Sequence, residues 1–346
     1  MLPLNRLTLC RIIQKANLYL STRCQSQIIN HQKARVFRTK QYCLFSTASL
    51  SKTYKLKSRG LVQLQGVDVV PLLHGLVTSD VTKLGLSEKS QYSMLLNVQG
   101  RVLYDLILYD VSHSMGENCL LVECEVTAVE EIMKLIKKYK LRKKVEITNK
   151  SEELSVLATL LNEDTNIEGK SESVVIETKD PRVLSFGRRT ILHSDKSYSK
   201  NYVIESSETS YHERRYEWGI PEGTTDLPPG NCTPLESNLV FMNGVSFDKG
   251  CYLGQELTAR THHTGVIRKR LMPVILDKVS TEQIEPGETV LDGNGKSVGK
   301  FRNSVGLYGL ALLRLADVTG TLYVKDKNGN PLTMKAVIPS WWPKDH

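Results

Sequence analysis

The chain has 346 residues, a net charge of +9 and ordinary contents of apolar, charged, Gly and Pro residues. This length allows two or three domains with a sizeable core, and the composition excludes a fibrous or wholly disordered protein. No run of about 18 apolar residues occurs, so the sequence predicts no membrane-spanning helix.

Most of the positive charge lies at the N-terminal end. Residues 1–50 carry eight Lys or Arg and no Asp or Glu, which leaves +1 (9 − 8) for the remainder. Cations spread among apolar, Ser and Thr residues are typical of a mitochondrial transit peptide, and a disordered basic tail is the alternative. We predict a transit peptide over residues 1–48. The rest of the chain gives little electrostatic reason to expect nucleic-acid binding.

Seven cysteines occur, and three of them lie within residues 1–50. The other four are Cys119, Cys124, Cys232 and Cys251, and they include no C-x-x-C pair. Cys119 and Cys124 would point to opposite faces of a strand because their separation is odd. This pattern favours individual thiols in a reducing compartment over a disulfide framework.

The first half of the chain predicts alternating strands and helices. Gln99-Gly100 is a hairpin signal, Pro71 suits the first turn of a helix, and Thr127 to Glu130 has the sequence of a capping box. The expected strands cover residues 57–66, 90–97, 101–110 and 119–124, and the expected helices cover 67–76 and 127–139.

Cations gather around the end of the second of these helices, from Lys134 to Lys144. They suit the negative end of the helix dipole. A solvated helix face is the first interpretation, and a docking patch for an acidic partner is the second. A nucleic-acid site is disfavoured because no interleaved aromatic platform accompanies the cations.

The second half changes character at about Val266. Strands are expected over residues 154–161 and 173–176, a polar loop over 193–210 and a short helix over 211–218. After Val266, short β-rich runs alternate with Gly turns, which predicts a small barrel. The irregular mixture of elements favours an α+β protein with a domain boundary near residues 266–272.

Cys251 lies in the segment most informative about function, Phe247-Asp-Lys-Gly-Cys-Tyr-Leu-Gly-Gln-Glu256. Gly250 and Gly254 allow a sharp bend, and a helix is expected to start at Gln255. A thiol near a helix N-terminus and beside Lys249 should have a lowered pKa, which suits a nucleophile or a metal ligand. A small Cys that merely fills a turn is the alternative.

Neither a hydrolytic site nor a complete metal site follows from these residues alone. His262 and His263 could supply a base or further ligands, but adjacent His residues are more often surface residues. An iron–sulfur cluster takes about four Cys ligands, and here only one thiol is well placed. A cluster would therefore need ligands from a second protein.

The segment Lys249-Gly-Cys-Tyr-x-Gly-Gln-Glu256 resembles the signature of the YgfZ-type, folate-binding family. The likeness continues through residues 257–268 and includes residues 215–223, 234–238 and 309–314. Within the family, the mitochondrial iron–sulfur assembly factor of animals is the most similar branch.

The resemblance implies a fold like the aminomethyltransferase, or T-protein, of the glycine cleavage system. A folate-binding-like α+β body would span residues 49–268 and a β-barrel residues 269–346. It implies a late-acting factor of the mitochondrial matrix that promotes maturation of four-iron four-sulfur proteins, with a link to heme biosynthesis. The partner would be an A-type cluster carrier in a heterodimer, sharing a two-iron two-sulfur cluster through Cys251. The motif residues supporting that thiol would be Lys249, Gly250, Tyr252, Gly254, Gln255 and Glu256.

The alternative is a tetrahydrofolate-dependent transferase of the aminomethyl type. In the T-protein, a Gly-rich stretch ends with two adjacent Asp residues, whereas this chain has Tyr104 followed by Asp105. The lost carboxylate puts transferase chemistry in doubt, although tetrahydrofolate binding could persist. Arg101, Tyr104 and Asp105 are the pocket candidates, and Asp105 could equally be a structural acid. The sequence favours a non-enzymatic factor and does not decide whether any turnover occurs.

Overall fold

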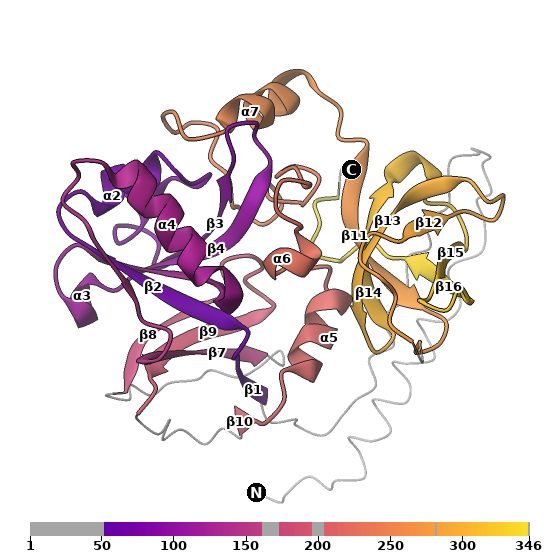
Figure 1. Ribbon diagram of the computed structural model, residues 1–346, viewed down its shortest axis with the longest axis horizontal. Helices are drawn as coiled ribbons and strands as arrows, with labels where there is room; N and C mark the ends of the chain where they lie inside the picture. Colours follow the sequence, from indigo (N-terminus) through magenta and orange to yellow (C-terminus); the bar gives the residue numbers. More distant parts are fainter. Residues whose placement is uncertain (1–51, 161–172, 196–203, 281, 345–346) are drawn as a thin grey trace, which may run out of the picture. The chain divides into compact units, whose positions relative to one another are not determined.

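The computed structural model describes residues 52–160, 173–195, 204–280 and 282–344. The strands of this part form two five-stranded sheets and one closed barrel (Figure 1). The α+β class and the C-terminal barrel expected from the sequence are thereby confirmed. The predicted transit peptide lies outside the described residues, and the predicted domain limits remain predictions.

The first sheet has the strand order β3-β4-β5-β2-β6. Its strands β3 and β4 form an antiparallel hairpin, so the hairpin predicted from Gln99-Gly100 is confirmed. The bounds are β2 (Arg59–Gln65), β3 (Ser90–Leu96), β4 (Val102–Asp110), β5 (Cys119–Glu125) and β6 (Glu146–Asn149).

Helices α2 (Val69–His74) and α4 (Val129–Lys140) cover one face of this sheet (Figure 1). Apolar residues of α4 at helical spacing, such as Ile132 and Ile136, are fully buried against the sheet. The predicted capping box is wrong, because residues Val126–Ala128 form a 3₁₀ turn and α4 begins one residue later. Thr127 therefore lies inside that turn and makes no capping hydrogen bond to α4.

The second sheet has the order β10-β1-β7-β9-β8. It packs on the other face of the first sheet through an apolar core that includes Tyr109, Leu121 and Ile191. Cys119 faces this core whereas Cys124 faces the helices, as the odd spacing predicted. The bounds are β1 (Lys52–Lys55), β7 (Leu154–Leu160), β8 (Val174–Lys179), β9 (Gly187–His193) and β10 (Ile204–Glu205).

A buried ion network joins the two sheets and the segments that follow them. Arg189 of β9 donates to Glu123 of β5 at 3.0 Å and to Glu222 at 2.8 Å. Arg182 donates to the same oxygen of Glu222 at 2.7 Å. The network consists of Arg59, Asp105, Glu123, Asp180, Arg182, Arg189, Arg215, Glu222 and Asp226, each less than a tenth exposed.

Charge in this network is balanced if Asp105 carries a proton. Burial raises the pKa of Asp105, Arg59 opposes the shift, and the charge of Glu222 adds to it. Burial alone would also raise the pKa of Glu222, but four arginines hold it well below its ordinary value. Four guanidinium groups then face four carboxylates. A balanced set is what a low-dielectric interior tolerates.

The depressed pKa values of Glu222 and Asp180 predict a defined acid sensitivity. Their contribution to stability is complete above the ordinary carboxyl pKa of about 4 and is lost as the pH falls through the lower folded-state values. The pKa of Asp105 is shifted in the opposite direction, so protonation of Asp105 adds nothing to this loss of stability. We expect the urea concentration at the unfolding midpoint to decrease when the pH is lowered below about 4, as measured by circular dichroism. This decrease in the urea midpoint should be smaller for Glu222→Gln than for the native protein. An equal decrease in both proteins would show that Glu222 does not cause the acid sensitivity.

The barrel has the closed order β11-β14-β13-β12-β15-β16 and is filled by apolar side chains such as Phe301 and Val274. The indole nitrogen of Trp341, beyond the last strand, donates to the carbonyl of Trp218 at 2.8 Å. The bounds are β11 (Lys269–Leu276), β12 (Thr289–Leu291), β13 (Ser297–Val305), β14 (Tyr308–Arg314), β15 (Leu322–Lys325) and β16 (Pro331–Ala336).

Short helices connect these layers. None of the helices in the described part of the chain is long and apolar enough to span a membrane. The predicted helix near residue 211 is confirmed as α5. The remaining bounds are α3 (Ser112–Met115), α5 (Thr209–Glu217), α6 (Gly223–Asp226), α7 (Gln255–Thr264), η1 (Val81–Lys83) and η3 (Leu315–Asp317).

Candidate functional site

Cys251 lies on an exposed bend just before helix α7. The other three described cysteines are buried, and all four are free thiols. Burial raises the pKa of Cys119 and Cys232, and raises that of Cys124 to about 12. Those three thiols are therefore poor nucleophiles and ligands, whereas the sulfur of Cys251 is open to a visiting protein.

Lys249 fixes the start of the bend. Its ammonium donates to the carbonyl oxygens of His74, Val77 and Ser79, each at 2.7 Å. Burial lowers the pKa of Lys249 to about 8, and Asp80 opposes that shift. The ammonium is thus used to join the bend to the end of α2. Sequence reasoning did not predict these three carbonyl acceptors of Lys249.

Gly254 ends the bend in the left-handed conformation, with φ +77°, and directly precedes the first residue of α7. A Cβ at this position would overlap the carbonyl oxygen of Asn97 and would lie 3.1 Å from the Cα of Gly100. Only glycine fits this approach of the bend to the β3–β4 hairpin without strain. The helix start predicted at Gln255 is confirmed.

The other motif residues serve the bend in different ways. Tyr252 is buried, with its ring 4.9 Å from the ammonium of Lys249. The side-chain oxygen of Gln255 accepts the N–H of Tyr252 at 3.3 Å. Glu256 is exposed in the first turn of α7. The motif therefore builds the bend that presents Cys251.

His74 is a neighbour of the bend that sequence reasoning missed. A Cβ on Gly250 would lie 3.9 Å from its Nε2, and its Nδ1 lies 3.4 Å from a carboxylate oxygen of Asp80. Burial lowers the pKa of His74, the charge of Lys249 lowers it further, and Asp80 opposes both. The imidazole is therefore neutral at neutral pH. No spacing rule could have linked it to a motif that begins 175 residues later in the chain.

His262 and His263 lie in the last turn of α7. The ring of His262 stacks on Phe247 with a centroid distance of 3.6 Å. Among the described residues, no group of three or more His, Cys, Asp or Glu side chains could hold a metal ion. Within that part of the chain, Cys251 has too few companions to hold a metal by itself.

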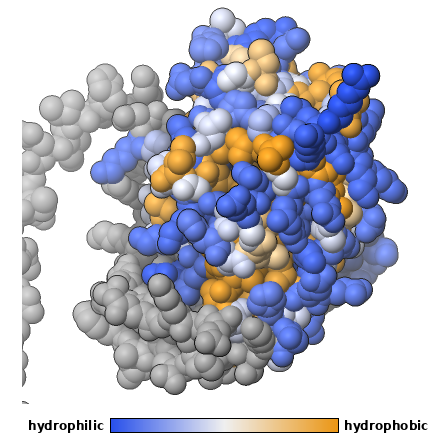
Figure 2. All heavy atoms as spheres, turned by 90° about the vertical axis from the view of Figure 1, so that its left-hand side faces the viewer, coloured by the Kyte–Doolittle hydropathy of each residue, from blue (hydrophilic) through white to orange (hydrophobic). Residues whose placement is uncertain are grey.

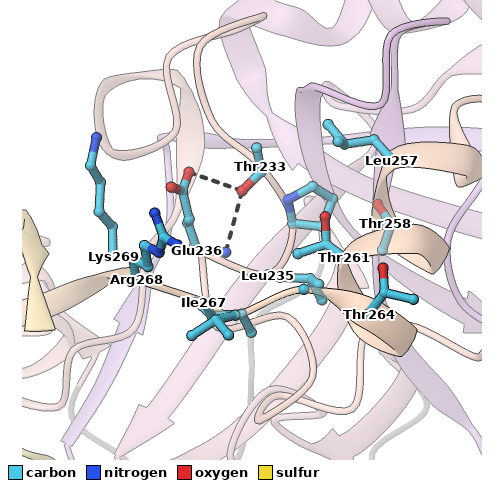
Figure 3. Close-up of a pocket in the computed structure, with 13 residues that line it drawn as sticks. Thr233, Leu235, Glu236, Leu257, Thr258, Thr261, Thr264, Ile267, Arg268 and Lys269 are labelled. Carbon is cyan, nitrogen blue, oxygen red and sulfur yellow. Dashed lines mark hydrogen bonds between the residues drawn. The ribbon is translucent and has the colours of Figure 1, made fainter.

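A cavity of about 540 Å³ runs along α7 and is lined by Leu257, Thr258, Thr261 and Thr264 of that helix. Figure 3 shows Thr258, Thr261 and Thr264 of that helix on one side and Arg268 on the other. Thr233, also at this cavity, donates to Glu236 at 2.9 Å. The cavity therefore offers hydroxyl and charged groups next to the helix that follows Cys251.

The three candidates for a folate pocket do not share one face. Tyr104 packs on the core beneath the helices, whereas Asp105, the next residue of β4, lies in the ion network between the sheets. Asp105 accepts the N–H of Gly223 at 2.9 Å, and its other oxygen lies 3.6 Å from Arg59. Arg101 lies in the hairpin turn, where Asn97 accepts its N–H at 2.9 Å. These contacts place Asp105 in the ion network, and its membership of a folate pocket stays a prediction.

The exposure of Cys251 predicts a clear order of thiol reactivity. On treatment of the folded full-length chain with an alkylating reagent, Cys251 should be modified well before Cys119, Cys124 and Cys232, because those three are buried. Peptide mapping by mass spectrometry at successive times measures the order. Equal rates for the four residues would contradict an open bend.

Comparison with known proteins first defines the class of fold. The structure matches glycine cleavage system aminomethyltransferase T from Bartonella henselae with a TM-score of 0.64 at 15% identity, over 84% of this chain and 86% of that one. The family described as CAF17, C-terminal beta-barrel domain, matches residues 268–344. The chain thus has an aminomethyltransferase T-like fold with a C-terminal barrel.

Sequence relatives then identify the family. The mouse protein named iron-sulfur cluster assembly factor IBA57, mitochondrial, is 42% identical over 305 residues, which cover 84% of this chain and 85% of that protein. The human protein of the same name is 40% identical over 303 residues, with the same shares. The chain belongs to the IBA57 family. The YgfZ-type resemblance and the T-protein-like fold predicted from the sequence are confirmed.

Proposed function

We propose that this chain is a late-acting iron–sulfur cluster assembly factor of the mitochondrial matrix. In this proposal it helps to mature four-iron four-sulfur proteins, with a consequent link to heme biosynthesis. It works with an A-type cluster carrier, and Cys251 is the ligand that it contributes to a two-iron two-sulfur cluster shared by the two proteins.

Among the described residues, Cys251 is the single accessible thiol and has no further ligands beside it, and this observation supports the proposal. Its bend is held on three sides, by the Lys249 contacts, by the packing of Gly254 on the hairpin and by helix α7. Such a sulfur is preorganised but incomplete as a cluster site, because a cluster takes about four ligands. A carrier that arrives with the other thiolates would complete it. The names of the mouse and human relatives agree with cluster assembly in mitochondria.

Substitution of Cys251 tests this proposal. We expect Cys251→Ala to lose the stable cluster-bridged complex with a cluster-loaded A-type carrier, because one iron ligand is removed. Anaerobic size-exclusion chromatography combined with visible absorption and circular dichroism measures the complex and its cluster. Asp248→Asn is the matched control, since Asp248 is exposed on the same bend and should leave both signals intact. The same complex and spectrum from Cys251→Ala would refute the bridging role.

Tetrahydrofolate binding is the second candidate, and the aminomethyltransferase T-like fold is the observation that favours it. The phenol oxygen of Tyr92 and one oxygen of Asp105 are buried without a hydrogen-bond partner in the described chain, so polar atoms are present for a polar guest. However, Asp105 is only 3% exposed, which fits a ligand poorly at that carboxylate. Calorimetric titration with tetrahydrofolate tests the candidate. Absence of heat at millimolar ligand would remove it, together with the transferase alternative.

A further inference from the structure

Six cations cluster at the C-terminal end of α4 and in the turn that follows it. We call this group the basic cap. No described carboxylate lies within ion-pair distance of any of the six, whereas Lys134, one turn earlier, is paired with Glu131 at 2.8 Å. The basic cap consists of Lys137, Lys138, Lys140, Arg142, Lys143 and Lys144. The six charged side chains therefore form no ion pair within the described part of this chain.

Two aliphatic side chains project from the same surface. Leu141 is 85% exposed and lies between the cations, and Val67 is 67% exposed. Val67 adjoins the cap because the carboxylate of Asp68 accepts the N–H of Lys144 at 2.7 Å. A hollow of about 550 Å³ lies beside Leu141 and is also lined by Asp68 and Tyr139. Figure 2 shows the side of the molecule on which α2, α3 and α4 lie, with hydrophobic patches among hydrophilic side chains.

The backbone holds Leu141 in this exposed position at a cost. Its φ is +50° and its ψ is −115°, a conformation that branched residues rarely adopt. Glycine adopts such a conformation without strain, whereas leucine does not. Strained backbone of this kind is concentrated at functional sites. Folding alone therefore does not explain an exposed leucine in this turn.

The kinds of residue decide which partner fits. Five of the six cations are lysines, and lysine is depleted at protein–protein interfaces whereas arginine is enriched there. Nucleic-acid sites rely on arginine forks and stacked aromatic rings, and the cap offers one arginine and one tyrosine. Lysines that surround exposed aliphatic side chains suit an anionic lipid surface, because electrostatic attraction and apolar insertion act together.

We propose that the basic cap, with Leu141 and Val67, docks this protein on the surface of a membrane that contains anionic phospholipids. The cations lie over the lipid headgroups, and Leu141 enters the boundary between headgroups and acyl chains. This contact is peripheral and reversible, and it is separate from the bend that carries Cys251. The two sites lie toward opposite ends of α2, because Asp68 precedes that helix and His74 ends it.

Vesicle flotation with the full-length chain tests this proposal. Vesicles of phosphatidylcholine mixed with phosphatidylglycerol should bind the protein, and vesicles of phosphatidylcholine alone should not. Lys138→Gln together with Lys144→Gln should weaken binding about fivefold per charge removed. Leu141→Asn should weaken it about tenfold because the apolar insertion is lost, and an unchanged circular dichroism spectrum and urea midpoint would show that the variant is folded.

Leu86→Asn is the matched control, because Leu86 is 88% exposed but lies outside the cap. The basic residues 1–50 contribute the same background in every variant. Unchanged binding of Leu141→Asn or of the double lysine variant would overturn the proposal. Equal binding to neutral vesicles would also overturn it, as would salt-sensitive retention on RNA or an acidic peptide without any binding to anionic vesicles.

Discussion

Replacing Arg189 by methionine is expected to lower the free energy of unfolding by about 3–5 kcal/mol. The guanidinium of Arg189 donates to Glu123, Asp180, Tyr211 and Glu222, and it is fully buried. Methionine fills a similar volume but leaves three carboxylates without that cation. Urea denaturation followed by circular dichroism measures the difference.

The neighbouring residue provides the matched control. Arg188 lies in the same strand, β9, but its side chain is 25% exposed and its guanidinium lies 3.4 Å from the carboxylate of Glu177. Arg188→Met should therefore cost no more than about 1 kcal/mol. If the two substitutions cost the same, the buried network does not stabilise the packing of the two sheets.

Replacing Gly254 by alanine is expected to disable the thiol site without touching the sulfur. A Cβ there would overlap the carbonyl of Asn97, and alanine at φ +77° adds backbone strain of about 1–2 kcal/mol. The bend must then move away from the hairpin, which displaces Cys251. We expect the affinity for a cluster-loaded A-type carrier to fall at least about tenfold, since 1.4 kcal/mol corresponds to that factor. Titration followed by visible circular dichroism measures this affinity.

Gly250→Ala tests whether every substitution of a glycine in this motif weakens carrier binding, or only one that displaces the bend. A Cβ on Gly250 would meet nothing nearer than the His74 ring at 3.9 Å, which is an ordinary contact. The variant should bind the carrier like the native protein. Should Gly254→Ala bind equally well, the approach of the bend to the hairpin is not what positions the thiol.

Local signals in the sequence predicted the parts of the fold that depend on neighbouring residues. The Gln99-Gly100 hairpin, the apolar spacing of α4 and the turn-rich barrel all follow from turn chemistry or periodicity. Strands β1, β6, β9 and β10 were not predicted, and β10 lies within the polar loop expected over residues 193–210. In β9, Arg188 and Arg189 obscure the apolar pattern of a buried strand, because their charges are compensated by residues of other elements.

The candidate site was likewise predicted where it depends on neighbouring residues, and not where it depends on distant ones. The bend around Cys251 and the start of α7 followed from two glycines and a helical run. The partners of Lys249 did not follow, since its three carbonyl acceptors belong to residues 74–79, far earlier in the chain. Likewise, no local signal predicted the contacts of Asp105 with Arg59 and Gly223, because they join segments far apart in the chain.

The buried ion network also affects how the two sheets unfold. Arg59 and Glu123 emerge early, Arg189 comes later, and Glu222 follows both sheets. The ion pairs of Glu222 with Arg182 and Arg189 form only when segments on both sides of the second sheet have come together. We therefore expect the two sheets to unfold together in one cooperative transition, because separating them would expose or unpair buried charges.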